Sequence, residues 1–436
     1  MRAVDAAAPE PVEVLIERAG AAVARAAVDL LGGTYGRRVV VVAGKGNNGA
    51  DGRAAARRLA ARGVRVEVLD AAGVPPRLPR ADLVVDAAYG TGFRGGWAPP
   101  DPAGAPVLAV DIPSGVDGLT GEVGGGALAA VRTVTFAALK PGLLLGAGPA
   151  LAGEVQVADI GLDVSGATAH LVEAADVAAW LPDRARDSHK WKAAVWLLAG
   201  SPGMTGAAHL AARAAQRAGA GYVRVGSPGV DDDPLRPTEA VGRALPAEGF
   251  APAVLDDLDR FGALAAGPGL GRAPATDAGV REVLAAAPVP VVVDGDGLTA
   301  LAGGDGPEAV LRARPAPTVL TPHDGEFARL AGAPPPPDRV DAARRLAARL
   351  GATVLLKGPT TVVADPDGAA LLSATGDVLT GTVAARLAQG VPPARAAAAG
   401  AWLHGRAGAL GFRRGLVAGD LADLLPVVLD DPTREA

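Results

Sequence analysis

The chain has 436 residues, no cysteine and a formal net charge of −5 at pH 7. Its length exceeds that of one typical hydrophobic core and predicts two domains. The lack of cysteine excludes disulfides, thiolate metal sites and a cysteine nucleophile, and the negative charge argues against a nucleic-acid partner. Because no apolar run is long enough to span a bilayer and the N-terminus lacks a signal-peptide pattern, we expect a cytoplasmic protein with no membrane partner.

Short apolar strands alternate with helical segments in the first part of the chain. Residues 12–31 carry apolar side chains at helical spacing, and the continuous apolar run 39–43 is typical of a strand buried on both faces. We expect a second helix at 54–62 and further strands at 64–69, 83–85, 107–110, 131–136 and 155–157. This alternation predicts a Rossmann-like, doubly wound α/β sheet as the N-terminal domain, over residues 1–165.

The alternation breaks between 163 and 186 and then resumes with a larger set of elements. Strands are predicted at 193–199, 222–225, 263–266, 289–293, 319–320 and 354–356, and helices at 206–218, 275–287, 340–349, 381–389 and 393–409. The second domain, over residues 185–430, is therefore also α/β, with a larger sheet.

Polar side chains collect at the ends of several predicted strands of the first domain. Asn47, Asn48 and Asp51 lie in a glycine-rich turn, and Asp86 and Asp111 each follow another strand. In an open parallel sheet these ends converge on a ligand crevice. Amide, carboxylate and hydroxyl oxygens together suit a hard cation. The alternative is that each aspartate only caps the helix after its strand.

Five stretches of this half resemble the YjeF N-terminal domain. They are Gly44-Lys45-Gly46-Asn47-Asn48-Gly49-Ala50-Asp51-Gly52, Gly90-Thr91-Gly92-Phe93-Arg94-Gly95, Asp111-Ile112-Pro113-Ser114-Gly115, Leu139-Lys140-Pro141-Gly142 and Asp159-Ile160-Gly161-Leu162. The resemblance covers roughly residues 1–163. It implies an epimerase that interconverts the R and S epimers of NADH or NADPH hydrated on the nicotinamide ring.

The same resemblance implies roles for individual residues. Asp111 would face the substrate and act as acid or base, and Asn48, Asp86 and Ser114 would ligate K⁺. The substrate would be held, besides Asp111, by Asn47, Asn48, Gly49, Ala50, Asp51, Gly90, Thr91, Gly92, Phe93, Arg94, Gly95 and Gly96.

A second set of strand-end turns lies in the second half. Gly376-Asp377 opens a predicted helix, whose N-terminus favours an anion. Gly267-Pro268-Gly269-Leu270-Gly271, Asp294 with Asp296, His323 and Lys357 each follow another predicted strand. His323 or Lys357 alone would more often be structural, and Asp377 could be a helix cap, but their repetition at strand ends favours a nucleotide crevice. A Walker-type phosphate loop is excluded, since its sequence does not occur.

This half resembles the ribokinase-like superfamily, and within it the ADP-dependent NAD(P)H-hydrate dehydratases, over roughly 185–425. The stretches that carry the resemblance are His189-Lys190, Ala199-Gly200-Ser201, Gly206-Ala207-Ala208, Ala218-Gly219-Ala220-Gly221, Gly267-Pro268-Gly269-Leu270-Gly271, Thr321-Pro322-His323 and Gly376-Asp377-Val378-Leu379. The resemblance implies a ribokinase-like α/β sandwich. The implied reaction is dehydration of the S-hydrate coupled to hydrolysis of ADP to AMP, with Mg²⁺ at the site.

On that resemblance Asp377 is the catalytic carboxylate. Ala207, Gly269, His323 and Asp377 would contact the hydrated dinucleotide. The nucleotide would be bound by Lys357, Gly358, Pro359, Thr360, Thr361 and Gly376. The partners are then the small molecules NADHX or NADPHX and ADP, in a homo-oligomeric protein.

The second half departs from the family pattern in two places that bear on activity. Ala374 stands where the family has glycine, and the connection 368–373 is short for a family that normally carries another strand there. The leading hypothesis is a bifunctional repair enzyme for hydrated NADH and NADPH. The alternatives are an ATP-dependent small-molecule kinase, an N-terminal half that only binds or dimerises, and a dehydratase half weakened to a scaffold.

Overall fold

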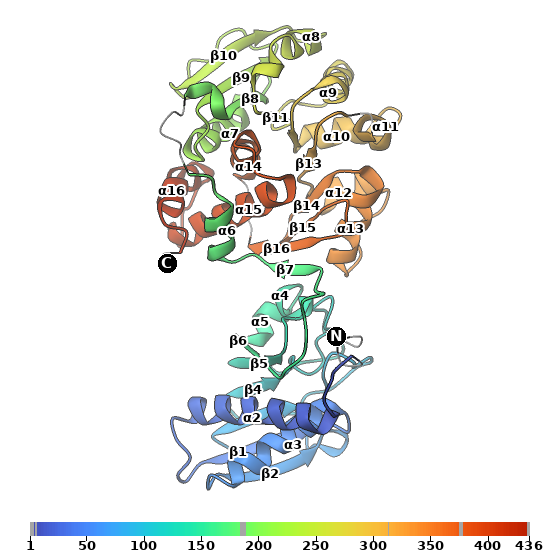
Figure 1. Ribbon diagram of the computed structural model, residues 1–436, viewed down its shortest axis with the longest axis vertical. Helices are drawn as coiled ribbons and strands as arrows, with labels where there is room; N and C mark the ends of the chain where they lie inside the picture. Colours follow the sequence, from blue (N-terminus) through green and yellow to red (C-terminus); the bar gives the residue numbers. More distant parts are fainter. Residues whose placement is uncertain (1–3, 5–6, 184–188, 313, 375–377, 434–436) are drawn as a thin grey trace. The chain divides into compact units, whose positions relative to one another are not determined.

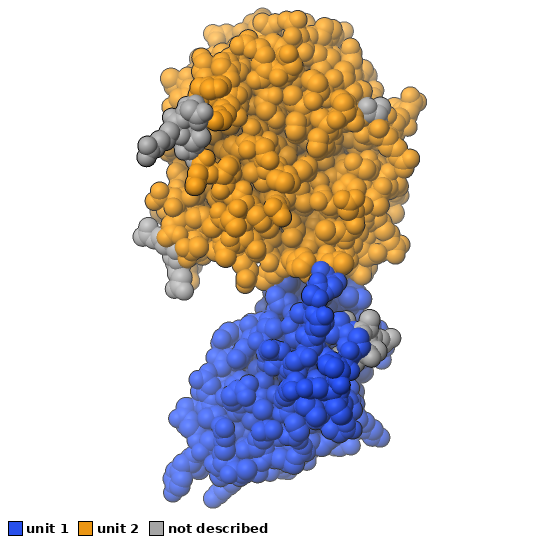
Figure 2. All heavy atoms as spheres, in the orientation of Figure 1, with its two compact units in different colours: residues 1–167 blue, residues 168–436 orange. Residues whose placement is uncertain are grey.

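The computed structural model describes residues 4, 7–183, 189–312, 314–374 and 378–433. The chain divides into two compact units, Met1–Ala167 and Thr168–Ala436 (Figure 2). Each unit has its own sheet (Figure 1). Within the described ranges, no helix combines the length and apolarity needed to cross a membrane.

Unit 1 is built on a six-stranded parallel sheet with the strand order β2-β1-β3-β4-β5-β6. The strands are β1 Arg38–Ala43, β2 Arg65–Asp70, β3 Leu83–Ala87, β4 Val107–Val110, β5 Arg132–Phe136 and β6 Glu154–Ala158. The central strands β3 and β4 are buried along their whole length. Their continuous apolar runs therefore fit strands that are covered on both faces.

The two long helices of unit 1 pack together on one face of the sheet. They are α2 Val12–Leu31 and α3 Asn47–Ala60, and both contribute to the same buried cluster as β1, β3, β4 and β5. A Cβ built on Gly20 would lie 2.4 Å from the Ala54 Cβ, so glycine permits the close approach of these helices. The opposite face is covered by connecting segments that contribute Leu78, Trp97 and Leu128. Two short helices, α4 Pro141–Leu144 and α5 Gly148–Ala152, follow β5.

The first glycine-rich turn is shorter than the sequence predicts. We expected a helix from residue 54, but α3 already begins at Asn47, and Gly46 is its N-cap. Asparagine and glycine are poor helix formers, so propensity placed the boundary too late. As a result, Asn47 and Asn48 lie in the first turn of a helix, where backbone N–H groups are left without intrahelical partners, and Asp51 lies in the second turn.

Unit 2 is built on a ten-stranded sheet with the order β10-β9-β8-β11-β12-β13-β14-β15-β16-β7. Only the β14–β15 and β15–β16 pairs are antiparallel. The strands are β7 Ala169–Leu171, β8 Ala194–Leu198, β9 Tyr222–Pro228, β10 Ala240–Leu245, β11 Ala263–Ala266, β12 Val291–Val293, β13 Thr318–Leu320, β14 Thr353–Leu356, β15 Thr360–Ala364 and β16 Ala370–Ala374.

Helices pack on both faces of this sheet (Figure 1). The helices are α6 Ala174–Trp180, α7 Thr205–Arg217, α8 Ala251–Leu255, α9 Pro274–Ala286, α10 Asp296–Ala302, α11 Pro307–Arg312, α12 Asp324–Ala331, α13 Arg339–Leu350, α14 Leu379–Ala388, α15 Pro393–Leu410 and α16 Ala418–Asp430. Helices α7, α14, α15 and α16 share one buried cluster with the sheet.

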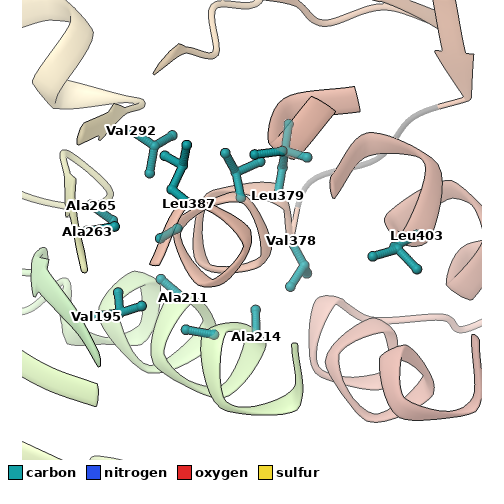
Figure 3. Close-up of a cluster of buried hydrophobic side chains, with 14 of the residues drawn as sticks. Val195, Ala211, Ala214, Ala263, Ala265, Val292, Val378, Leu379, Leu387 and Leu403 are labelled. Atoms are coloured by element: carbon teal, nitrogen blue, oxygen red, sulfur yellow. The ribbon is translucent and has the colours of Figure 1, made fainter. Parts of the chain in front are cut away.

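Helix α14 is buried along its whole length in unit 2. All ten of its residues are buried, and Val378, Leu379 and Leu387 pack against sheet residues such as Val292 and against α7 (Figure 3). A Cβ on Gly381 would lie 2.1 Å from the Ala211 carbonyl oxygen, so α14 and α7 are in backbone contact there. The segment that opens with residue 378 is therefore fixed rigidly to the core.

Two expectations about domain edges are corrected by the sheet of unit 2. Residues 168–183, predicted to lie in the break between domains, contribute β7 and α6, and β7 pairs with β16. The strand thought to be missing from the short 368–373 connection is present as β16, which pairs with β15 from Thr360↔Ala374 to Ala364↔Ala370. A tight turn after β15 leaves enough residues for a full strand, which length alone did not reveal.

Candidate active sites

The polar strand-end residues of unit 1 converge at one edge of its sheet. Asn48 at the start of α3 donates from Nδ2 to the Val110 carbonyl oxygen at the end of β4, at 2.6 Å. A Cβ on Gly90 would lie 3.1 Å from the same Nδ2, so the 90–96 loop adjoins Asn48. The other polar side-chain atom of Asn48, Oδ1, is buried and has no hydrogen-bond partner among the described residues. An unsatisfied buried acceptor calls for a ligand.

Asp86 and Ser114 form a buried hydrogen-bonded pair that contacts Tyr89, the neighbour in sequence of Gly90. Asp86 is fully buried on β3 and accepts from the Ser114 hydroxyl at 2.6 Å and from the Ser114 backbone N–H at 2.9 Å. Burial raises the pKa of Asp86, while the bonds from Ser114 and Ala88 oppose the rise. The Ser114 hydroxyl also accepts from the Tyr89 backbone N–H at 2.8 Å, which ties the start of the 90–96 loop to the pair.

Asp111 is held in a strained backbone conformation next to this pair. Its φ is +67°, and the Ile112 N–H donates back to the Val110 carbonyl oxygen across it, which makes a γ-turn of the rare positive-φ type. Such strain persists only where the surroundings enforce it, and it clusters at active sites. Here Oδ1 accepts from Lys140 Nζ at 2.6 Å and from the Thr135 hydroxyl at 3.2 Å. No hydrogen bond within the described part of the chain reaches Oδ2.

Lys140 is the functional residue of unit 1 that the sequence reasoning did not assign. It is 4% exposed, and its Nζ also donates to Thr135 Oγ1 at 2.9 Å and to the Phe136 carbonyl oxygen at 2.8 Å. All three ammonium protons are therefore satisfied, and the side chain of Asp111 is fixed through one oxygen. The signal was visible in the Leu139-Lys140-Pro141-Gly142 stretch, since Lys140 is one of only five lysines in the chain.

Asp51 brings a second carboxyl group to the site from α3. Its side chain is buried, and burial together with the nearby charge of Asp111 raises its pKa to about 8. Asp51 is thus protonated at neutral pH, whereas Asp111 is in an ion pair. A site that combines a protonated carboxyl group with a second carboxyl group in an ion pair can both give and accept a proton.

The predicted substrate loop of unit 1 is the exposed side of this site. Gly92, Arg94, Gly95 and Gly96 are exposed, while the Phe93 ring packs against the Tyr89 ring with centroids 4.2 Å apart. Arg94 Nη1 donates to the carbonyl oxygens of Thr91 and Phe93 and lies 3.4 Å from Asp117. Asn47 is exposed as well.

In unit 2 the predicted substrate residues Ala207 and Gly269 are neighbours. A Cβ on Gly269, whose φ is +67°, would lie 3.0 Å from the Ala207 Cβ and 2.9 Å from the Met204 carbonyl oxygen. The Ser201 hydroxyl donates to the Gly269 carbonyl oxygen at 2.9 Å. The turns after β8 and β11 therefore pack together at the carboxyl ends of adjacent strands.

The turn after β11 approaches the end of β12 so closely that only glycine fits. Gly267 has a φ of +134°, and a Cβ there would lie 1.7 Å from the Asp294 carbonyl oxygen. We expect Gly267→Ala to lower the free energy of unfolding by about 2 to 4 kcal/mol, from backbone strain plus the clash. Urea unfolding measures this loss.

Gly332→Ala is the matched control, because Gly332 has a φ of +85° but open space around it. It carries the conformational cost alone, about 1 kcal/mol. If both variants lost the same free energy of unfolding, a steric clash at Gly267 would be contradicted.

Asp294 lies at the centre of the unit 2 site; the sequence placed it among the strand-end residues of the predicted nucleotide crevice without an individual role. It is 8% exposed at the end of β12 and accepts from Lys357 Nζ at 2.6 Å and from the Thr380 hydroxyl on α14 at 2.5 Å. Burial alone would raise its pKa, but Lys357 and the hydroxyls of Thr380 and Thr321 reverse this and hold the pKa below its usual value. Asp294 is therefore an ionised carboxylate.

His323 reaches the same site from the end of β13, as the N-cap of α12. Its Nδ1 accepts from the Gly325 backbone N–H at 3.0 Å, and its Nε2 lies 3.5 Å from the carboxyl group of Glu326. The imidazole is 58% exposed, so it is open to a ligand. Burial raises the pKa of Glu326, which Lys357 and His323 partly offset and Asp294 reinforces.

The predicted nucleotide residues differ in their exposure. Lys357 is half-buried and Pro359 is exposed, while Thr361 is fully buried within the sheet on β15. The Thr361 hydroxyl is buried and has no hydrogen-bond partner among the described residues. Gly376 and Asp377 lie outside the described residues. The helix that follows them, α14, begins beside Asp294, to which Thr380 of its first turn donates a hydrogen bond.

Comparisons with known proteins give matches for both units. The sequence model described as NAD(P)H-hydrate dehydratase matches residues 195–428, and the one described as YjeF-related protein N-terminus matches residues 12–78 and 70–142. A ribokinase-like superfamily protein of Enterococcus faecalis is 22% identical, with a TM-score of 0.52 over 62% of this chain and 98% of that chain. At that identity the likeness shows the fold of unit 2 alone.

Curated relatives match almost the whole chain. A bifunctional NAD(P)H-hydrate repair enzyme of Moorella thermoacetica is 39% identical over 96% of this chain and 92% of its own length. The enzyme of the same description from Salinibacter ruber is 38% identical over the same shares. Sequence identity of this extent across both units is much higher than proteins need to share only a fold. The chain therefore belongs to the family of bifunctional NAD(P)H-hydrate repair enzymes.

Proposed function

We propose that this protein repairs hydrated NADH and NADPH in two steps. Unit 1 interconverts the R and S epimers of the hydrate, and unit 2 dehydrates the S epimer to NADH or NADPH while ADP is hydrolysed to AMP and phosphate. The observation that carries the proposal is the occurrence in one chain of both family matches, each over a unit with a strand-end site. The two activities form a sequence, because the first supplies the epimer that the second consumes.

For the epimerase step, Asp111 is the proposed acid–base residue. Inversion at the ring carbon that bears the hydroxyl requires this group to leave as water and to return on the opposite face. Both steps move a proton at the hydroxyl oxygen. Asp111, fixed through Oδ1 by Lys140, has Oδ2 left to exchange a proton, and the protonated carboxyl of Asp51 lies in the same cluster. The substrate contacts are assigned to the starts of α3 and of the 90–96 loop.

One observation supports a potassium ion in the unit 1 site. Asn48 Oδ1 is a buried acceptor without a partner among the described residues, and amide, carboxylate and hydroxyl oxygens are ligands for a hard cation. We propose that Asn48, Asp86 and Ser114 hold K⁺, which would supply a positive charge near the substrate.

For the dehydratase step, Lys357 to Thr361 and Gly376 are assigned to ADP, and Ala207, Gly269, His323 and Asp377 to the hydrated dinucleotide. Phosphorylation of the ring hydroxyl turns a poor leaving group into a good one, which gives ADP hydrolysis its purpose. A Mg²⁺ ion fits this site as an ion carried by the nucleotide, because Mg²⁺ is usually held by substrate phosphates and one or two carboxylates. Consistently, no cluster of three or more acidic or histidine side chains forms a metal site within the described ranges.

The test is to incubate the protein with mixed hydrate epimers and ADP and to follow the absorbance of the regenerated reduced dinucleotide. Recovery of both epimers supports both activities, and recovery of neither would contradict the dehydratase assignment. Transfer of phosphate to a stable product, with no recovery, would favour a small-molecule kinase.

We expect Asp377→Asn to lower the recovery rate of both epimers by about 10²- to 10⁴-fold, because it removes the catalytic carboxylate. Thermal unfolding should be unchanged. Normal turnover by this variant would contradict the role of Asp377.

A further inference from the structure

The buried carboxylate of Asp294 joins two parts of unit 2 that are far apart in sequence. Its Oδ1 pairs with Lys357 Nζ, 63 residues away at the end of β14, and its Oδ2 accepts from the hydroxyl of Thr380, 86 residues away in the first turn of α14. The Gly295 backbone N–H adds a third bond at 2.8 Å. Lys357 is assigned above to the nucleotide, and α14 follows shortly after Asp377 in the sequence, the residue assigned to the dehydration chemistry.

The surroundings of Asp294 leave it little freedom. Its backbone carbonyl packs against Gly267, and α10 starts directly after it at Asp296. Thr380 belongs to α14, whose residues are all buried and which is in backbone contact with α7. Asp294 is thus held between the end of β12 and the buried start of α14, and its carboxylate fixes the end of the Lys357 side chain.

A buried ion pair of this kind is a weak source of stability. Removing two charges from water costs about as much as their attraction returns, and apolar replacements are often neutral or stabilising. Lys357 Nζ makes one of its three possible hydrogen bonds with Asp294, and no other hydrogen bond of this group lies within the described residues. The ammonium group is half-buried and retains donors for an anion.

We propose that Asp294 is a positioning residue of the dehydratase site: it fixes the ammonium group of Lys357 relative to the first turn of α14, so that both address the phosphates of one bound nucleotide. This inference rests on the proposed dehydratase function and deepens it. Asp294 acts through Lys357 and Thr380 and does not itself contact the substrate.

The test compares Asp294→Asn, Lys357→Met and the double variant, using the S-hydrate so that epimerisation is not required. We expect Asp294→Asn to lower kcat/KM for ADP about 10- to 100-fold, since a charge-assisted bond orients Lys357. Because Asp294 acts through Lys357, the double variant should be no worse than Lys357→Met alone. Multiplication of the two single losses, or a loss below twofold in Asp294→Asn, would overturn the proposal.

Two further variants keep the result interpretable. Thr380→Val removes only one hydroxyl and should lower kcat/KM for ADP about three- to tenfold; an unchanged value would contradict the role given to α14. The matched control is Asp257→Asn, which breaks the Arg224–Asp257 ion pair of unit 2, outside the residues assigned to the site. It should alter kcat/KM by less than twofold, and a loss equal to that of Asp294→Asn would indicate a merely structural effect.

Binding of ADP, measured by titration calorimetry, separates this inference from the proposed function. If the wild-type protein binds ADP without dehydrating the hydrate, the proposed function fails, while about tenfold weaker binding by Asp294→Asn still supports the positioning role. Equal ADP affinity of Asp294→Asn and the wild type would overturn it.

Discussion

Replacing Asp111 by asparagine should abolish use of the R-hydrate and leave use of the S-hydrate intact. Asparagine keeps the shape of the side chain but cannot exchange a proton at Oδ2, and it deprives Lys140 of its charged partner. Loss of a positioned acid–base group costs about 10²- to 10⁴-fold in rate. The measurement is the rate of recovery from each pure epimer in the presence of ADP.

The S-hydrate serves as an internal control, because its dehydration is assigned to unit 2. Recovery from the R-hydrate should fall to the rate of spontaneous epimerisation. Thr135→Val is a second control: it removes a hydroxyl bonded to both Asp111 and Lys140 and should produce a smaller loss. Wild-type recovery from the R-hydrate by Asp111→Asn would contradict the assignment.

Replacing Asp51 by asparagine should stabilise unit 1 at pH 8 and have little effect at pH 4. The folded protein keeps the Asp51 proton up to about pH 8, whereas the unfolded chain releases it near the ordinary value of 3.8. Between these values the folded state binds more protons, so its stability falls as the pH rises from about 4 to 8. Asparagine has no proton to release in this range, so the variant lacks the pH-dependent loss of unfolding free energy, which is roughly 3 to 6 kcal/mol.

Hydrogen exchange followed by mass spectrometry measures this effect, because it reports peptides of α3 and β1 separately from unit 2. Variant and wild type are compared at each pH. Glu67→Gln is the matched control, since Glu67 is an exposed carboxyl group on β2 in the same unit. A constant difference between Asp51→Asn and the wild type from pH 4 to pH 8 would contradict the burial of a protonated carboxyl.

The sequence predicted the layout of both sheets from local patterns. Strand runs such as 39–43 and 263–266 are apolar throughout, and this signal depends only on neighbouring residues. It located most central strands within one or two residues. It missed the edge strands β7 and β10 and the neighbouring hairpin of β15 and β16, which are less uniformly apolar or closely spaced. Pairing with a neighbouring strand, and not local composition, decides that these segments are strands.

The strand-end motifs of the sequence named Asp86, Asp111 and His323 as site candidates, and the fold brings each to the carboxyl edge of its sheet. Lys140 stood in a family-like stretch and Asp294 at a strand end, but neither received an individual role, because nothing local distinguishes a buried lysine or aspartate from an exposed one. Their roles depend on partners that are remote in sequence, such as Asp111 for Lys140 and Lys357 for Asp294.

What the sequence by itself determined is the fold class, the family and the set of glycine-rich turns, since these follow from periodicity and from residues adjacent in the chain. Only the tertiary structure decided the charge states and contacts within the sites. Burial raises the pKa of Asp51, an ion pair fixes Asp111, and Asp294 joins β14 to α14. Desolvation and Coulomb interactions depend on distances in space, which no local pattern of residues contains.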